Sequence, residues 1–171
     1  NSLFVSGMSG KIDTPVIYYA GLAANKAKKY DEAKEMFQTC TKLNYGADNK
    51  EKANNYFFLA DVYRSKGDTA KFIETLKKGI DKYPKDNTVL VVELINHYLG
   101  TKQVAAAKSY LEIAIQNDPN NPTYHFALGT IYDSNDKNYD KAIECYKKAI
   151  ELKGDVFDYQ YNLGALYFNQ A

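Results

Sequence analysis

The side chains that most often carry out chemistry are few and scattered in this sequence. The chain of 171 residues has two histidines, His97 and His125, and two cysteines, Cys40 and Cys145. A catalytic or metal site needs several such groups at spacings that let them converge, and these four residues have no such spacing. Glycine-rich phosphate loops and nucleophile motifs are also absent from the sequence. We therefore expect no catalytic residue and no cofactor, and we interpret the four as structural or surface residues.

One acidic segment is similar in composition to a calcium-binding loop. It runs from Asp133 to Asn138 and reads DSNDKN. A calcium loop of the helix-loop-helix type requires a central glycine and a glutamate at a fixed distance, and this segment lacks both. We expect no metal here, and we interpret the segment as a turn between two helices that contains one extra residue.

The segment from Pro122 to Leu152 contains two consecutive helical patterns. In each pattern small and large residues recur three and four positions apart, so that they share one face of a helix. A face that alternates small and large side chains lets two antiparallel helices approach closely and interdigitate. These residues are Leu128, Gly129 and Tyr132 in the first helix, and Ala142, Tyr146 and Ala149 in the second.

The same pair of patterns repeats along the chain. The small position of the first helix has spacings of 39, 35, 34 and 35 residues and falls at Gly21, Ala60, Ile95, Gly129 and Gly164. The large position of the second helix has spacings of 39, 35 and 35 residues and falls at Phe37, Leu76, Leu111 and Tyr146. Two independent positions with one period indicate an internal repeat. Ile95 is larger than the glycine it replaces, so we expect the two helices of that repeat to lie slightly further apart.

This period and pattern resemble the tetratricopeptide repeat (TPR) family, whose repeats have about 34 residues. The motifs of that family are aromatic-x-x-Leu-Gly-x-x-Tyr in the first helix, Ala-x-x-x-Phe in the second, and a closing proline. The chain matches them at Tyr56-x-x-Leu59-Ala60-x-x-Tyr63, at Ala33-x-x-x-Phe37, and at Pro84 and Pro119. The resemblance covers the chain from about Thr14 to its end. It implies an all-α fold, a right-handed α-solenoid of about nine helices stacked as antiparallel pairs.

The resemblance divides the chain into four repeats and a final half-repeat. Residues 1–13 form a lead-in or the tail of a preceding repeat. The final helix has no second helix after it, so we expect an exposed apolar edge that a longer array or another copy of the chain covers. The predicted repeats are 14–49 with a longer loop, 50–86, 87–121 and 122–154, and residues 155–171 form the first helix of a further repeat or a cap.

Charge and hydropathy argue against two classes of partner. The net charge is +1, whereas nucleic-acid binding relies on a basic stripe, so we expect no nucleic-acid partner. The most apolar run, residues 89–95, is short and contains Glu93, so we expect no membrane insertion. The resemblance to the TPR family implies a protein or peptide partner of unknown identity.

In a TPR array the first helices line the concave side, and the resemblance therefore implies a partner-binding groove on those helices. The row that faces this side is mainly apolar and aromatic with a few polar residues, which suits an extended peptide or an amphipathic helix. Aromatic residues at the first position of the row can equally serve packing alone. The candidate groove residues are Tyr18, Leu22, Asn25, Phe57, Asp61, Arg64, Val92, Asn96, Phe126, Thr130, Asp133 and Tyr161.

The resemblance implies a protein-interaction scaffold and not an enzyme. The family's clamp for carboxylate-ended peptides needs lysine and asparagine where Tyr18 and Leu22 stand, so we do not expect that specificity. Two alternatives stay open. The chain can be a targeting or regulatory module of a larger protein whose catalytic domain lies outside it, or a self-assembling structural element that forms a homo-oligomer through its exposed final helix.

Overall fold

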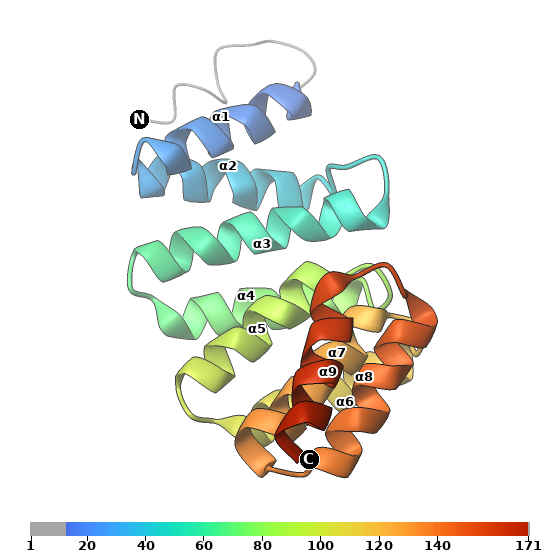
Figure 1. Ribbon diagram of the computed structural model, residues 1–171. Helices are drawn as coiled ribbons and strands as arrows, with labels where there is room; N and C mark the ends of the chain where they lie inside the picture. The colour runs from blue at the N-terminus through green and yellow to red at the C-terminus, as the bar shows by residue number, and fades with distance from the viewer. Residues whose placement is uncertain (1–12, 171) are drawn as a thin grey trace. The chain divides into compact units, whose positions relative to one another are not determined.

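Helices make up most of the chain in the computed structural model, which describes residues 13–170 (Figure 1). Apart from residue 13, the predicted lead-in lies outside the described residues. Within the described residues there are nine α-helices, one π-helical turn and no strand, so the all-α fold class is confirmed. The elements are α1 (Thr14–Lys26), α2 (Tyr30–Lys42), α3 (Asn49–Ser65), α4 (Thr69–Lys82), α5 (Thr88–Gly100), α6 (Val104–Asn117), α7 (Pro122–Ile131), the π turn η1 (Tyr132–Asp136), α8 (Tyr139–Leu152) and α9 (Phe157–Gln170).

The helices form two compact units, which are described separately. The N-terminal unit, residues 1–86, contains α1 to α4, and the C-terminal unit, residues 87–171, contains α5 to α9. Within each unit every helix packs against the next one in the chain. This packing produces the antiparallel hairpins α1–α2, α3–α4, α5–α6 and α7–α8, with α9 against α8 (Figure 1). Stacked antiparallel helix pairs, the predicted architecture, are therefore present in both units.

Two of the hairpins close where a glycine faces a large ring. A Cβ atom built on Gly129 would lie 2.7 Å from Cδ1 of Tyr146, and one built on Gly21 would lie 3.1 Å from Cε1 of Phe37. At Gly129 a methyl group would force the ring to shift, and at Gly21 it would make a tight contact, so the absent side chains allow the close spacing of the two helices. The residues at all four large positions are completely buried, namely Phe37, Leu76, Leu111 and Tyr146.

The third hairpin is packed less closely than the other three. The helices α5 and α6 make less contact along their length than the helices of the other hairpins do. Ile95 occupies the small position of α5 and is buried. The lower contact has the direction expected from the sequence, since isoleucine is larger than the glycine at this position in other repeats.

The turns inside the hairpins follow the same period as the motifs. In the first three turns a backbone N–H donates to the carbonyl five residues back, as Lys29 does to Ala24 at 2.9 Å, which is the pattern of a Schellman cap. In the fourth turn Asn138 donates to Tyr132, six residues back, at 2.8 Å, because the π turn η1 holds one more residue. The extra residue predicted for this segment is thus confirmed. Each turn has one residue with positive φ, and these are Lys28, Gly67, Lys102 and Lys137.

The helix α3 begins at Asn49, the last residue that the sequence pattern assigned to the first repeat. The Asp48 side chain accepts a hydrogen bond from the N–H of Glu51 at 2.8 Å, and the Glu51 carboxylate accepts one from the N–H of Ala47 at 2.8 Å. Such reciprocal bonds satisfy amide groups that the first helical turn leaves without partners. The cap therefore fixes the start of α3 one residue before the predicted repeat boundary.

Candidate interaction surface

Three of the predicted groove residues meet in the N-terminal unit. Asn25 lies near the end of α1, and Asp61 and Arg64 lie on α3. Nδ2 of Asn25 donates to Oδ2 of Asp61 at 3.1 Å, and Nη2 of Arg64 donates to Oδ1 of Asp61 at 2.5 Å. We call Asn25, Asp61 and Arg64 the polar trio. It connects the first helices of the first and second repeats directly.

An aromatic ring supports one end of the polar trio. The guanidinium carbon of Arg64 lies 5.5 Å from the centre of the Phe72 ring on α4, a distance typical of a cation–π contact. The side chains of Arg64 and Asp61 are 49% and 26% exposed, so their ion pair is at the surface. Because surface ion pairs contribute little to stability, the main effect of these contacts is to hold the three polar groups in fixed orientations.

Among the apolar groove residues of this unit, Tyr18 is half-buried and packs against the core. The centre of its ring lies 6.3 Å from that of Phe37, 5.9 Å from that of Phe58 and 5.4 Å from that of Tyr45. Burial also raises the pKa of its phenol. Leu22 packs against the same core. Of the two roles that the sequence left open, packing or partner contact, these ring contacts favour packing for Tyr18.

Phe57 occupies the same position of the repeat as Tyr18 and, like Tyr18, is half-buried. Its ring centre lies 5.3 Å from that of Phe58. Phe57, Asp61 and Arg64 follow one another four and three residues apart on α3, so they share one stripe of that helix. A partly exposed aromatic ring thus lies on the same stripe as two members of the polar trio.

In the C-terminal unit several predicted groove residues contact neighbouring helices of the unit. The ring centre of Phe126 on α7 lies 5.6 Å from that of Tyr146 on α8 and 4.7 Å from that of Tyr159 on α9. The Thr130 hydroxyl donates to the carbonyl of Phe126 at 3.1 Å. Asp133 accepts a hydrogen bond from the Tyr146 hydroxyl at 3.4 Å. Packing within the unit accounts for these three residues.

The remaining groove candidates of the C-terminal unit lie at the surface. On α5, Val92 is half-buried and Asn96 is exposed.

On α9, Tyr161 is 63% exposed and stacks on Phe157, which is 72% exposed, with ring centres 5.6 Å apart. Phe168, two turns after Tyr161, is 82% exposed. We call Phe157, Tyr161 and Phe168 the α9 aromatic stripe. The predicted groove row omitted Phe157, although its position four residues before Tyr161 was the signal that could have found it.

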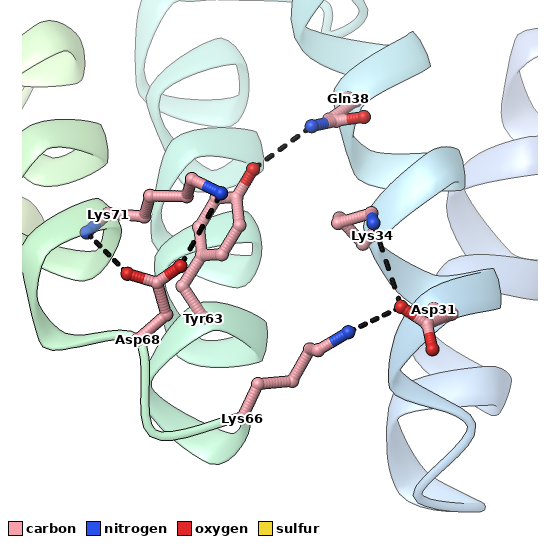
Figure 2. A network of polar contacts seen from close by, with 7 residues as sticks. All are labelled: Asp31, Lys34, Gln38, Tyr63, Lys66, Asp68 and Lys71. Atoms are coloured by element: carbon pink, nitrogen blue, oxygen red, sulfur yellow. Dashed lines mark hydrogen bonds and ion pairs between the residues drawn. The ribbon is translucent and has the colours of Figure 1, made fainter.

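A network of polar contacts joins α2 to α3 (Figure 2). Asp31 on α2 pairs with Lys34 at 3.6 Å and with Lys66, which follows α3. The hydrogen bond and charge of Lys66 hold the pKa of Asp31 below its ordinary value. Nε2 of Gln38 on α2 donates to the Tyr63 hydroxyl on α3 at 3.0 Å. These contacts position the first repeat against the second, and with it the two helices that carry the polar trio.

The two cysteines are buried or half-buried, and the acidic turn contains an ion pair. Cys40 is completely buried and Cys145 is half-buried, both as free thiols, and burial raises the pKa of each to about 11. Such thiols are poor nucleophiles at neutral pH.

In the acidic turn, Asp136 pairs with Lys108 on α6 at 2.5 Å. Within residues 13–170 no three His, Cys, Asp or Glu side chains are arranged so that they could hold a metal ion.

A helix that spans a bilayer needs about 20 consecutive, predominantly apolar residues. None of the helices in residues 13–170 combines the length and apolar character needed for such a span.

Antiparallel helix hairpins that recur with a fixed period define a helical repeat protein. The chain belongs to the tetratricopeptide repeat family. Models of this family described as tetratricopeptide repeat match residues 16–45 and 53–86, and one described as TPR repeat matches residues 137–170. Repeats of this family are protein-interaction modules, so the general role of the chain is that of an interaction scaffold.

The chain is similar to short parts of much longer curated proteins. It is 30% identical over 89 residues to the E3 SUMO-protein ligase RanBP2 of Homo sapiens, and 28% identical over 89 residues to the RANBP2-like and GRIP domain-containing protein 8 of Homo sapiens. Both matches cover 52% of this chain, but 3% and 5% of those proteins. The chain therefore spans a small fraction of the length of these relatives.

Solved structures of the same fold cover nearly the whole chain. One is residues 41 to the end of MamA from Desulfovibrio magneticus RS-1, with a TM-score of 0.62, 17% identity and coverage of 95% of this chain and 88% of that chain. Another is TTC0263, a thermophilic TPR protein in Thermus thermophilus, with a TM-score of 0.62, 20% identity and coverage of 91% and 82%. At these identities the likeness establishes the fold alone.

Proposed function

We propose that the chain is a non-catalytic scaffold that binds an extended peptide or a partner helix along its first helices. The observation that carries this proposal is the meeting of Asn25, Asp61 and Arg64 beside the half-buried Phe57 in the N-terminal unit. Peptide recognition generally combines an apolar anchor, which supplies buried area, with fixed polar groups, which set direction. This surface contains both.

The polar trio is suited to the direction-setting role. Because Nδ2 of Asn25 donates to Asp61, the side-chain amide has one orientation and presents its Oδ1 as an acceptor for a partner's N–H. The carboxylate of Asp61 holds Asn25 and Arg64 at the same time. A partner segment that crosses α1 and α3 would therefore meet prearranged polar groups, which lowers the entropy cost of binding.

In the C-terminal unit we propose a second contact area of fewer residues. It consists of the half-buried Val92 and the exposed Asn96 on α5, and of the exposed Tyr161 on α9. Phe126, Thr130 and Asp133 support this area by packing and hydrogen bonding within the unit. Tyr18 and Leu22 support the area of the N-terminal unit in the same way.

A peptide selection with matched variants tests the proposed groove. Peptides selected from a random displayed library on the 171-residue chain are measured by calorimetry against the unmodified chain, Phe57→Ala and Asn25→Ala. Each variant is expected to weaken binding at least about tenfold while circular dichroism stays unchanged. The control is Ile113→Ala, which removes an exposed aliphatic side chain from α6 and is expected to leave affinity unchanged. Equal affinity of all four proteins would contradict the groove.

A second candidate function is a targeting or regulatory module of a larger protein. The observation that favours it is that a similar segment forms 3% of a protein named as an E3 SUMO-protein ligase. Immunoblotting of the native protein from its source tests this candidate. A band far above the 19.3 kDa of this chain is expected, and a band at that mass would contradict it.

A third candidate function is self-assembly through the final helix. The observation that favours it is the high exposure of the α9 aromatic stripe, because contiguous exposed apolar surface generally marks an interaction site. The mass of the chain in solution as a function of concentration tests this candidate, and a constant monomer mass would contradict it.

A further inference from the structure

One face of α9 is apolar and has room for another helix. Besides the α9 aromatic stripe, Tyr167 is 45% exposed. Gly164 lies between these residues, and a Cβ built on it would meet no heavy atom of the described residues within 4 Å. At the equivalent position of α7, Gly129 lies directly against the ring of Tyr146. Gly164 therefore offers the same kind of space for a large side chain, but that space is unfilled in the described part of the chain.

A second exposed apolar face lies on α1. Val16 is 54% exposed and Tyr19 is 65% exposed, and they are three residues apart on one side of the helix. Tyr18 and Leu22 pack into the core from the other side of α1. Of the ten exposed large hydrophobic residues among those described, six lie on α1 or α9. Exposed apolar surface is thus concentrated at these two helices.

Charged residues of opposite sign lie at the ends of the two helices that carry these faces. Lys26 ends α1 and Lys28 follows it, whereas Asp155 precedes α9 and Asp158 lies in its first turn. The same asymmetry holds for the units. Residues 1–86 contain 15 Lys and Arg against 11 Asp and Glu, and residues 87–171 contain 7 against 10. The net charges are therefore +4 and −3, which favours association between the N-terminal unit of one copy and the C-terminal unit of another.

We propose that copies of this chain associate head to tail, with the α9 face of one copy docked antiparallel on the α1 face of the next. In this arrangement Tyr19 lies against Gly164, as Tyr146 lies against Gly129 within the α7–α8 hairpin. The same register brings Val16 to Phe168 and Lys26 to Asp158. The contact joins two different surfaces, so it is heterologous and can extend to further copies. This inference rests on the third candidate function, self-assembly, and is independent of peptide binding on the first helices.

Variants that remove one face at a time test the proposal. The mass of the 171-residue chain is measured by sedimentation over a range of concentrations and is expected to rise above 19.3 kDa. Phe157→Glu with Phe168→Glu removes the α9 face, and Val16→Glu with Tyr19→Glu removes the α1 face. Each double variant is expected to weaken association at least about tenfold. Gln116→Glu, at an exposed position of α6, is the control that adds charge away from both faces and is expected to associate normally.

Mixing the two double variants distinguishes a head-to-tail contact from a symmetric one. Each variant keeps one intact face, so the mixture is expected to form a one-to-one heterodimer that neither variant forms alone. An unmodified chain that stays monomeric at every concentration would overturn the proposal. So would an α1-face variant that still self-associates, or a mixture without heterodimer. None of these outcomes tests the peptide-binding proposal, which is examined separately with Phe57→Ala and Asn25→Ala.

The charged ends provide a second test that does not alter the apolar faces. Lys26→Glu or Asp158→Lys alone is expected to weaken association a few-fold, because each places like charges at the contact. The two changes in one chain are expected to restore it, because the pair then has opposite signs again. If the double variant instead loses as much association as the two single variants together, the antiparallel contact would be contradicted.

Discussion

At Gly129 the main chain of α7 approaches the Tyr146 ring so closely that no other residue fits. Gly164 occupies the same position of the next repeat but has open space around it. The two glycines thus have the same place in the motif and different surroundings, because Gly129 lies against a ring of α8 and Gly164 meets no atom of the described residues.

Replacing these glycines by alanine should therefore have opposite effects. Gly129→Ala is expected to lower the free energy of unfolding by about 1–3 kcal/mol, because the new methyl group forces the buried Tyr146 ring aside. Gly164→Ala is expected to raise it by up to about 1 kcal/mol, because alanine favours the helix and meets no neighbour. Urea unfolding followed by far-ultraviolet circular dichroism measures both. Equal effects of the two changes would show that the ring contact does not set the helix spacing.

The buried thiol of Cys40 predicts a pH dependence of stability. Its pKa is raised to about 11 from an ordinary value of 9.0, so the folded chain holds the proton more tightly than the unfolded chain. The resulting stability is complete below pH 9 and is lost as the pH rises towards 11. Cys40→Ala removes this contribution, and Ala114 and Ala149 show that alanine fits the equivalent position in other repeats. The difference in urea midpoint between the unmodified chain and Cys40→Ala should change between pH 9 and pH 11. A constant difference would contradict the raised pKa of Cys40.

At the scale of elements, hydrogen bonds between helix starts determine how successive hairpins are aligned. In the C-terminal unit the hydroxyl of Tyr124 on α7 donates to Oδ1 of Asn87, the residue before α5, at 2.9 Å. Nδ2 of Asn121 donates to the hydroxyl of Thr88 at 2.8 Å. Tyr124 and Asn87 are 1% and 2% exposed, so these bonds replace water contacts that the groups have lost.

Removing one hydroxyl from this contact tests its contribution. Tyr124→Phe is expected to lower the free energy of unfolding by about 1–2 kcal/mol, because it removes a buried hydrogen bond to the Asn87 side chain. The control is Tyr139→Phe, since Tyr139 is 39% exposed and its hydroxyl can exchange with water. Thermal unfolding by calorimetry measures both variants. A similar effect of the two would show that the buried hydrogen bond does not align α5 and α7.

At the scale of the whole molecule, the described helices divide into two compact units. Every helix packs on the next one within its unit, and the contacts divide into two compact sets. In such repeat proteins stability is approximately a sum of repeat and nearest-neighbour terms. A local change should therefore have a local effect.

Hydrogen exchange measured by mass spectrometry tests this locality. Gly129→Ala is expected to speed amide exchange in residues 87–170 much more than in residues 13–86, because the altered contact belongs to the C-terminal unit. Gly21→Ala is the reciprocal change, since its Cβ would meet the Phe37 ring in the N-terminal unit. Uniform acceleration along the chain by either variant would instead indicate one cooperative unit.

The helical architecture was predictable from the sequence because it depends on side-chain size and spacing along single helices. The contact between Gly129 and Tyr146 is indicated by the period of small and large residues. The segment from Asp133 to Asn138 has one residue too many for a regular turn, and the chain accommodates it as a π turn. Such features are local, so nearby residues are sufficient to specify them.

The surface, by contrast, was decided by tertiary packing. Tyr18, Phe57 and Phe126 share one position of the repeat and are all half-buried, but they contact different rings: Tyr18 contacts Phe37, Phe57 contacts Phe58, and Phe126 contacts Tyr159. The sequence placed Asn25, Asp61 and Arg64 on the same face of two helices. Their hydrogen bonds depend on the rotation and distance of α1 relative to α3, which the contacts of many other side chains determine. The sequence by itself therefore determined which helices pair, and the tertiary structure determined which side chains meet and which stay exposed.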